Sequence, residues 1–274
     1  MLYEREVDDL RDALRGLDAI SGQANKPDMY LLSLDADANG RGQVVLAHGN
    51  PDIAQHVLTT VPGTYSDLGD AMDYVHNGDT VMHRAQQLAP NQSFSSVTWV
   101  NYEAPKSLLL AGNGGYANDA SANLSNFQQG LRASHAPDLP PSNNTVIGHS
   151  YGSTVVGYAA RDHGLPVNNI GFIGSPGVGV DKASDLHLPR GHVWSGTADL
   201  DVIQYATPSP NPVDYFPLNQ PDHLWYGVNP SDPRFGARQI PTDWSAGHSG
   251  YWSHDQSIDG MARIVANQGG PAPR

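Results

Sequence analysis

The chain has 274 residues, and its 15 Lys+Arg against 28 Asp+Glu give a net charge of −13, which opposes binding to a nucleic-acid backbone. It contains no cysteine, which excludes disulfide scaffolds, thiolate metal sites and cysteine nucleophiles. No apolar run approaches the roughly 18 residues of a membrane-spanning helix, so we expect a soluble globular protein. The charged start has no signal-peptide pattern, and as written the chain is expected to be cytoplasmic; an upstream region in a longer natural protein would change this expectation.

The first segment, Tyr3–Ile20, predicts an amphipathic helix. Val7, Leu10, Leu14 and Leu17 recur at spacings of three and four and form one stripe, which we expect to dock on the core. Glycine, asparagine and proline then interrupt the pattern, so residues 1–28 are expected to form this helix and a linker.

Three β-rich runs follow the linker and predict a strand meander at Tyr30–Leu34, Gln43–Ala47 and Gln55–Val61. Beyond them helices and strands alternate, which favours right-handed crossovers and a largely parallel sheet with helices on both faces. The expected helices are Met72–Leu88, Ala117–Arg132, Ser153–His163 and Ser257–Asn267, and the expected strands are Ser96–Val100, Thr145–Gly148, Asn169–Ile173 and His192–Gly196.

The pattern from residue 29 to residue 268 predicts one α/β domain. Within it, residues 204–247 are rich in proline and aromatic residues and have no sustained period. Such a long segment inside a compact domain is commonly a lid or a pocket wall, and we predict that role here. Residues 269–274 are expected to form a frayed tail.

A candidate nucleophile lies in the run Gly148-His149-Ser150-Tyr151-Gly152, which is Gly-x-Ser-x-Gly directly after an expected strand and before an expected helix. This is the nucleophile-elbow pattern, in which a strained turn exposes the serine hydroxyl and side chains at the flanking glycines would collide with neighbouring backbone. The alternative is a glycine-rich turn with a structural serine. The strand before and the helix after favour the elbow.

A serine nucleophile needs a histidine base and a carboxylate that orients it, in the chain order Ser, acid, His for an α/β hydrolase. Asp199 and Asp201 follow the expected strand that ends at residue 196, where such sheets place functional groups. Asp222 and Asp243 compete more weakly, because they lie in the proline-rich segment. A solvated turn is the alternative interpretation of the two preferred aspartates.

The preferred base is His248, which lies between small residues just before the last expected helix. His254 and His223 are the alternatives. His149 adjoins the nucleophile, but its side chain is expected to point away from the hydroxyl, and we interpret it as a packing or hydrogen-bonding residue.

Acyl transfer also needs two donors for the oxyanion. One is commonly the amide after the nucleophile, here Tyr151, and the other comes from the loop after an early strand. Gly63 or Thr64 is the expected second donor, with a plain β-turn as the alternative. The 12 histidines show no His-x-His or His-Glu-x-x-His spacing, so no metal site is predicted. No nucleotide-binding glycine motif is complete, and no cofactor is expected.

Several segments together resemble a mainly actinobacterial α/β-hydrolase family catalogued as a domain of unknown function. The resemblance covers roughly residues 30–267. It rests on Val61-Pro62-Gly63-Thr64, Trp99-Val100-Asn101-Tyr102-Glu103-Ala104-Pro105, Gly148-His149-Ser150-Tyr151-Gly152-Ser153, Gly174-Ser175-Pro176-Gly177, Phe235-Gly236-Ala237 and Gly247-His248-Ser249-Gly250-Tyr251-Trp252.

The resemblance implies an α/β-hydrolase fold over residues 29–268 and a serine triad, with no agreed substrate. The family commonly has Asp-Pro-Ile or Asp-Pro-Val after the acid strand, which favours Asp201 over Asp199 and makes Val202 a departure. A second departure is Asn50, which stands where the family has an aspartate.

The sequence therefore predicts a serine hydrolase for a small-molecule ester, acting through an acyl-enzyme on Ser150 with His248 and Asp201. An acyltransferase with the same triad, or a non-catalytic binding module that retains the fold, is the alternative. The sequence does not indicate an oligomeric state.

Overall fold

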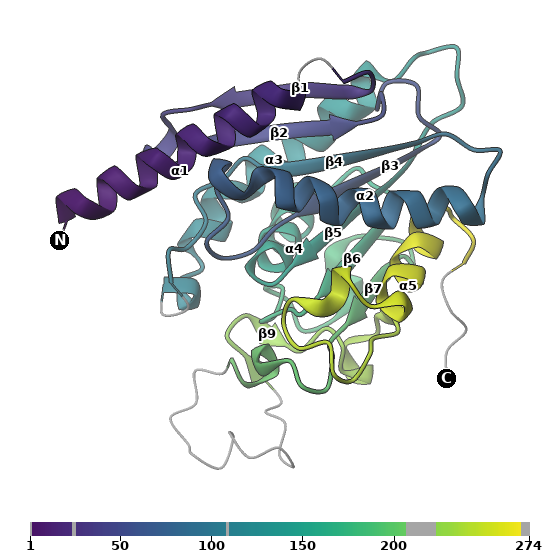
Figure 1. Ribbon diagram of the computed structural model, residues 1–274. Helices are drawn as coiled ribbons and strands as arrows, with labels where there is room; N and C mark the ends of the chain where they lie inside the picture. Colours follow the sequence, from purple (N-terminus) through teal and green to yellow (C-terminus); the bar gives the residue numbers. More distant parts are fainter. Residues whose placement is uncertain (1, 24–25, 108–109, 207–222, 270–274) are drawn as a thin grey trace.

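An eight-stranded sheet forms the centre of the computed structural model, which describes residues 2–23, 26–107, 110–206 and 223–269 (Figure 1). The strand order is β1-β2-β4-β3-β5-β6-β7-β10, antiparallel between β1, β2 and β4 and parallel from β4 onward. The strands are β1 (Met29–Asp35), β2 (Gln43–His48), β3 (His56–Val61), β4 (Phe94–Val100), β5 (Asn143–His149), β6 (Asn169–Ile173), β7 (Val193–Gly196) and β10 (Arg238–Gln239). A separate hairpin pairs β8 (His223–Leu224) with β9 (Gly227–Val228). The mostly parallel sheet confirms the predicted fold class.

Helices cover both faces of the sheet (Figure 1). The helices α3 (Gly115–Ser134) and α4 (Tyr151–His163) pack on one face, whereas α1 (Leu2–Gln23), α2 (Ala71–Leu88) and α5 (Asp255–Val265) pack on the other. Short 3₁₀ turns complete the described chain: η1 (Ala38–Gly40), η2 (Leu68–Asp70), η3 (Leu110–Gly112), η4 (Ala183–Leu186), η5 (Val202–Tyr205), η7 (Pro233–Phe235) and η8 (Gly250–Trp252). In the described residues no helix combines the length and apolarity needed to cross a membrane.

The central strands are apolar on both sides because both faces of the sheet are covered. Val57 and Val146 point into the core under α3 and α4. Their chain neighbours Leu58 and Ile147 point into the core under α2 and α5, as the two-residue period of a strand requires. This double burial fixes the register of β3 and β5, and it thereby fixes the positions of the loops that follow them.

The predicted meander is wrong. The first two strands form an antiparallel pair, but β2 then pairs with β4, and β3 lies between β4 and β5 in parallel. The return of β3 to the interior of the sheet places its carboxyl end directly beside that of β5.

The predicted docking face of the first helix is also wrong. Ala13, Gly16 and Ile20 are the buried positions, while Leu10 and Leu14 of the expected stripe are 53% and 61% exposed. The physical reason is a close approach: a Cβ at position 16 would lie 2.1 Å from the carbonyl oxygen of Leu68. Small residues let the helix lie against that backbone, and this contact outweighs the burial of the leucine stripe.

Within residues 204–247 the structure describes three short strands, of which β10 extends the main sheet beside β7. Residues 207–222 lie outside the described chain, as do residues 270–274 of the predicted tail. The predicted lid and the predicted domain boundaries stay predictions.

Candidate active site

Ser150 lies on a sharp turn between β5 and α4, at the carboxyl edge of the sheet. Its backbone has φ 55° and ψ −130°, a conformation that L residues rarely adopt. The flanking glycines make the turn possible: a Cβ on Gly148 would lie 2.5 Å from the Cα of Ser153, and one on Gly152 would lie 2.1 Å from the carbonyl oxygen of Val61. Backbone atoms therefore lie so close to both positions that neither could carry a side chain, as the sequence predicted.

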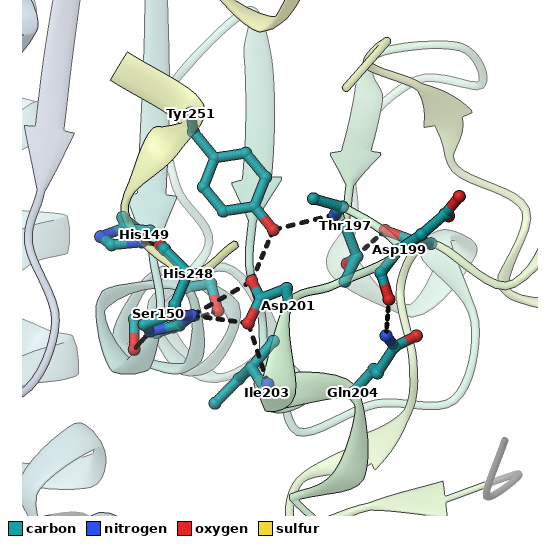
Figure 2. A network of polar contacts seen from close by, with 12 residues as sticks. His149, Ser150, Thr197, Asp199, Asp201, Ile203, Gln204, His248 and Tyr251 are labelled. Carbon is teal, nitrogen blue, oxygen red and sulfur yellow. Dashed lines mark hydrogen bonds and ion pairs between the residues drawn. The ribbon is translucent and has the colours of Figure 1, made fainter. Parts of the chain in front are cut away.

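Three side chains from distant parts of the sequence form one hydrogen-bonded line (Figure 2). The Ser150 hydroxyl lies 2.8 Å from His248 Nε2. The other ring nitrogen, Nδ1, lies 2.9 Å and 3.1 Å from the two carboxylate oxygens of Asp201. A carboxylate only accepts, so Nδ1–H donates to Asp201 and leaves Nε2 free to accept the serine proton. The structure thus brings together the preferred serine, histidine and aspartate of the sequence prediction.

The Asp201 carboxylate is fully buried and heavily hydrogen-bonded. The Ile203 amide donates to Oδ1 at 2.9 Å, and the Tyr251 hydroxyl donates to Oδ2 at 2.5 Å. Burial acts to raise the pKa of Asp201, but the bonds from His248, Tyr251 and the Ile203 amide outweigh it and hold the pKa below its ordinary value. The carboxylate is therefore ionised at neutral pH despite its burial.

The His149 ring supports the histidine loop from the strand side. It packs against the rings of His248, Tyr251 and Trp252, with a centroid distance of 5.0 Å to His248. Its Nε2–H donates to the carbonyl oxygen of His248 at 2.8 Å. Burial, with the neighbouring His248, lowers the pKa of His149 to about 4, so this ring is neutral wherever the site works near neutral pH. His149 therefore acts as the predicted hydrogen-bonding residue.

The turn after β3 faces the nucleophile. A Cβ on Gly63 would lie 2.6 Å from the Ser150 Cβ and 3.0 Å from its Oγ, so only glycine fits there. The Tyr102 hydroxyl lies 2.7 Å from the Pro62 carbonyl oxygen and 3.2 Å from that of Gly63, so it ties this turn to the segment after β4. Within the described chain the amides of Gly63 and Thr64 have no protein acceptor.

The helix α4 begins at Tyr151, and the first amides of a helix have no acceptor within that helix. The Tyr151 N–H directly follows Ser150, the candidate nucleophile. The turn after β3 and the start of α4 thus supply the three amides predicted as oxyanion donors, and both segments adjoin Ser150.

Gly174, at the end of β6, forms the floor beneath the acid. It has φ 54°, and a Cβ there would lie 2.8 Å from Asp201 Oδ2 and 3.0 Å from the Tyr251 ring. A side chain at this position would displace the carboxylate from His248.

The alternative acids and bases lie away from this line where the structure describes them. Asp199 is exposed and its backbone carbonyl accepts from Gln204 at 2.6 Å. Asp243 accepts from Ser245 and lies 3.7 Å from His254, so these two candidates face each other instead of Ser150. Asp222 and the side chain of His223 lie outside the described residues.

Two supporting tyrosines had no assigned role in the sequence prediction. Tyr251 and Tyr102 are buried, and each bonds a group far away in the chain through its hydroxyl. Both occur in segments that carry the family resemblance, which is the signal that could have identified them.

In the described part of the chain no cluster of His, Cys, Asp or Glu is arranged to hold a metal ion.

Comparison with known proteins identifies sequences and structures that this chain resembles. Residues 37–211 match a family profile described as alpha/beta hydrolase. The uncharacterized protein Rv2079 of Mycobacterium tuberculosis is 32% identical over 203 residues, covering 69% of this chain and 30% of that protein. The uncharacterized protein Rv0963c of the same species is 29% identical over 237 residues, covering 83% of this chain and 86% of that protein.

A solved structure with a similar fold is that of esterase LipW from Mycobacterium marinum. Its TM-score is 0.50 at 12% identity, with 94% of this chain and 87% of that chain covered. The chain spans about 30% of the length of the first curated relatives that it matches.

Proposed function

This chain belongs to the alpha/beta hydrolase family, and from that membership we propose that it is a serine hydrolase that cleaves carboxylic esters through an acyl-enzyme on Ser150. One observation carries the proposal: the unbroken hydrogen-bonded line from Ser150 through His248 to the ionised Asp201, built on a strained elbow. A structural serine needs neither the strained backbone nor a histidine whose second nitrogen is held by a buried carboxylate.

In the first half-reaction the Ser150 oxygen attacks the ester carbonyl carbon while His248 Nε2 takes the hydroxyl proton. The carbonyl oxygen becomes an oxyanion, which the Tyr151 amide and an amide of Gly63 or Thr64 stabilise. The C–O bond to the leaving group then breaks, and the leaving alkoxide takes the proton from His248. The products are an alcohol and an acyl-Ser150 ester.

In the second half-reaction water attacks the acyl carbon and gives its proton to His248. The tetrahedral intermediate collapses, the Ser150 oxygen leaves with the proton returned by His248, and a carboxylic acid departs. Asp201 remains ionised throughout and stabilises the imidazolium that forms in each half-reaction. No cofactor enters either step.

Esters are the substrate class that fits this site with the fewest added requirements. An alkoxide leaves a tetrahedral intermediate more readily than an amide nitrogen, so an ester makes the smaller demand on His248 as the proton donor to the leaving group.

A fluorophosphonate probe tests the proposal, because labelling requires a nucleophilic, activated and accessible serine at once. We expect peptide mapping to find the label on Ser150, and we expect Ser150→Ala to lose both labelling and about 10⁴- to 10⁶-fold of the rate on p-nitrophenyl acetate. Ser184→Ala, at an exposed serine, is the matched control. A label on another residue, or a Ser150→Ala variant as active as the parent, would overturn the assignment.

A further inference from the structure

One edge of the sheet carries an exposed apolar surface on α1 and β1. We call it the α1–β1 surface, and its residues are each between 37% and 61% exposed: Leu10, Leu14, Tyr30, Leu31, Leu32 and Leu34. Single exposed leucines are ordinary, but six exposed large apolar residues on one helix and the edge strand beside it are typical of an interaction site. Leu31 and Leu34 pair with Leu46 and Val44, which lie in the core under α1, whereas Tyr30 pairs with Ala47 on the opposite face.

The strand of this surface is an open edge. β1 pairs with β2 on one side and is the last strand of the described sheet on the other. A bulge between Leu31 and Ser33 interrupts the pairing, yet the strand stays extended from Met29 to Asp35 and contains no lysine or proline. Edges are commonly protected by such residues or by being short, as β10 is at the opposite edge. β1 is therefore available to pair with another strand.

The helix extends over this open edge. A groove of about 380 Å³ separates α1 from β1, with Leu17 and Ile20 on the helix side and Leu31 and Leu34 on the strand side. Leu14 and Leu10 precede Leu17 at spacings of three and four, so they continue the same flank of the helix. A strand added beside β1 would extend the sheet beneath this flank.

The helix and the strand run in opposite directions, and Leu14 lies within about one helical turn of the level of the middle of β1. Asp9 lies 3.9 Å from Arg41, beyond the end of β1, whereas Gln23 and Met29 line the groove together. Leu14 is about 14 Å from the end of α1 at 1.5 Å per residue. The middle of β1 is about 10 Å from the strand's start at roughly 3.3 Å per residue. One axis perpendicular to the sheet can therefore pass close to both Leu14 and the middle of β1.

From this geometry we propose that the α1–β1 surface joins two copies of the chain about a twofold axis, β1 pairing antiparallel with β1 and α1 with α1. The charges at the rim of the surface fit this arrangement. Arg11 and Asp18 lie three and four residues on either side of Leu14, so a twofold axis near Leu14 places Arg11 of one copy opposite Asp18 of the other, twice. Arg11 also lies 3.1 Å from the exposed Asp8 of its own helix, so it would bridge the two aspartates. The same surface is thus complementary to itself in apolarity and charge.

A lipid surface is the competing occupant of an apolar helix flank, and charge disfavours it. The segment Leu2–Gln23 contains six acidic and three basic residues, which anionic lipid would repel. The twofold arrangement instead places Arg11 of each copy opposite Asp18 of the other, although Arg11 and Arg15 also pair with Asp8 and Asp12 of their own helix.

The oligomeric state tests the proposal, and it does so independently of any catalytic activity. We expect sedimentation velocity to show a concentration-dependent dimer, and we expect Leu14→Glu and Leu31→Glu each to raise the dissociation constant at least tenfold with unchanged circular dichroism. Leu139→Glu, at a leucine 40% exposed outside the surface, should leave the dimer intact.

A charge exchange tests the twofold arrangement itself. Arg11→Asp alone and Asp18→Arg alone each place like charges opposite each other and should weaken the dimer, whereas the double variant should restore it. A chain that stays monomeric at about 100 μM, a dimer unaffected by the leucine variants, or binding of the monomer to phosphatidylcholine–phosphatidylglycerol vesicles would overturn the proposal.

Discussion

Ser150 combines two properties that a serine seldom has together. Its backbone lies in a strained region with positive φ, and its side chain is 4% exposed yet bonded to His248. The strain costs of order 1 to 3 kcal/mol, and the surrounding contacts of β5, α4 and the turn after β3 must hold it. The residue is thus presented rigidly, which favours attack from one direction.

The two neighbouring aspartates provide a sharp test of roles. Asp201→Asn should lower kcat/KM on p-nitrophenyl acetate about 10³- to 10⁴-fold, because an amide N–H opposite His248 Nδ1 favours the tautomer whose Nε2 carries the proton. Asp199→Asn should change it less than twofold, since the Asp199 side chain is exposed and outside the line.

Steady-state kinetics of the two purified variants, with thermal melts as the folding control, make the comparison. Equal and small effects would contradict the choice of Asp201 and direct attention to other carboxylates.

At this scale the sequence identified the three side chains that the structure brings together, but it did not identify the tyrosines that support them. Ser150 could be identified because a strained turn requires glycines at fixed spacing, and that spacing is local. Tyr251 and Tyr102 could not be assigned from spacing, because each hydroxyl bonds across about 40 to 50 residues of chain. Between the two aspartates, the residues alone left both open, and only the family resemblance favoured Asp201.

At the scale of elements, the turn after β3 and the elbow after β5 meet at Ser150. They adjoin because β3 and β5 are paired in parallel, from His56 beside Asn143 to Val61 beside Gly148. The positions of the proposed oxyanion donors therefore depend on strand pairing more than on either loop alone.

The close approach of Gly63 to Ser150 predicts the effect of adding one methyl group at position 63. Gly63→Ala would place a Cβ 2.6 Å from the Ser150 Cβ, so the turn must shift away, and we expect kcat to fall at least 100-fold, the loss typical of one missing oxyanion donor. Gly130→Ala in α3, where no atom lies within 4 Å of the added carbon, is the control and should retain full activity.

Activity and melting temperature of both variants should be measured together. A Gly63→Ala variant with parental kcat would show that this turn supplies no donor.

The sequence predicted which segments form strands and which form helices, but it did not predict which strands pair or which face of α1 is buried. Periodicity reports which side of a segment is apolar, and it placed every strand of the main sheet except the two-residue β10. It does not report which strand lies beside which, so β3 was placed in a meander instead of between β4 and β5. The burial of α1 through Ala13 and Gly16 was missed because close backbone packing uses small residues, which contribute little to an apolar stripe.

For the whole molecule, the sheet order predicts a gradient of local stability. β3 is buried at all six positions and hydrogen-bonded on both sides, whereas β1 is mostly exposed and bonded on one side. In hydrogen–deuterium exchange by mass spectrometry we expect peptides from β3 to exchange at least 100-fold more slowly than those from β1 at low protein concentration. Equal protection of the two strands in a dilute sample would contradict this gradient.

The global stability should also depend on the protonation of His149. Its pKa is about 4 in the folded chain and about 6.5 in an unfolded one, so between these values the unfolded state binds more protons. The free energy of unfolding should therefore fall as the pH decreases from about 6.5 to about 4, by about 2 to 3 kcal/mol from this group.

His149→Gln keeps a donor for the His248 carbonyl but removes the titration. Urea unfolding of both proteins across this pH range should show a shallower slope for the variant. Parallel curves would mean that the ring is protonated as easily in the folded chain as in the unfolded one.

The site is assembled from segments far apart in the chain: His248 is 98 positions after Ser150 and 47 positions after Asp201. Each segment is delivered by a different strand or by the loop before α5, so no fragment of the chain contains a working set of groups. During refolding, secondary structure can form early from local contacts, but the return of activity must wait for the latest long-range contact to form. The return of activity would therefore report the final step of folding. The delay between recovery of the circular dichroism signal and recovery of activity would measure how late the carboxyl-terminal loop docks.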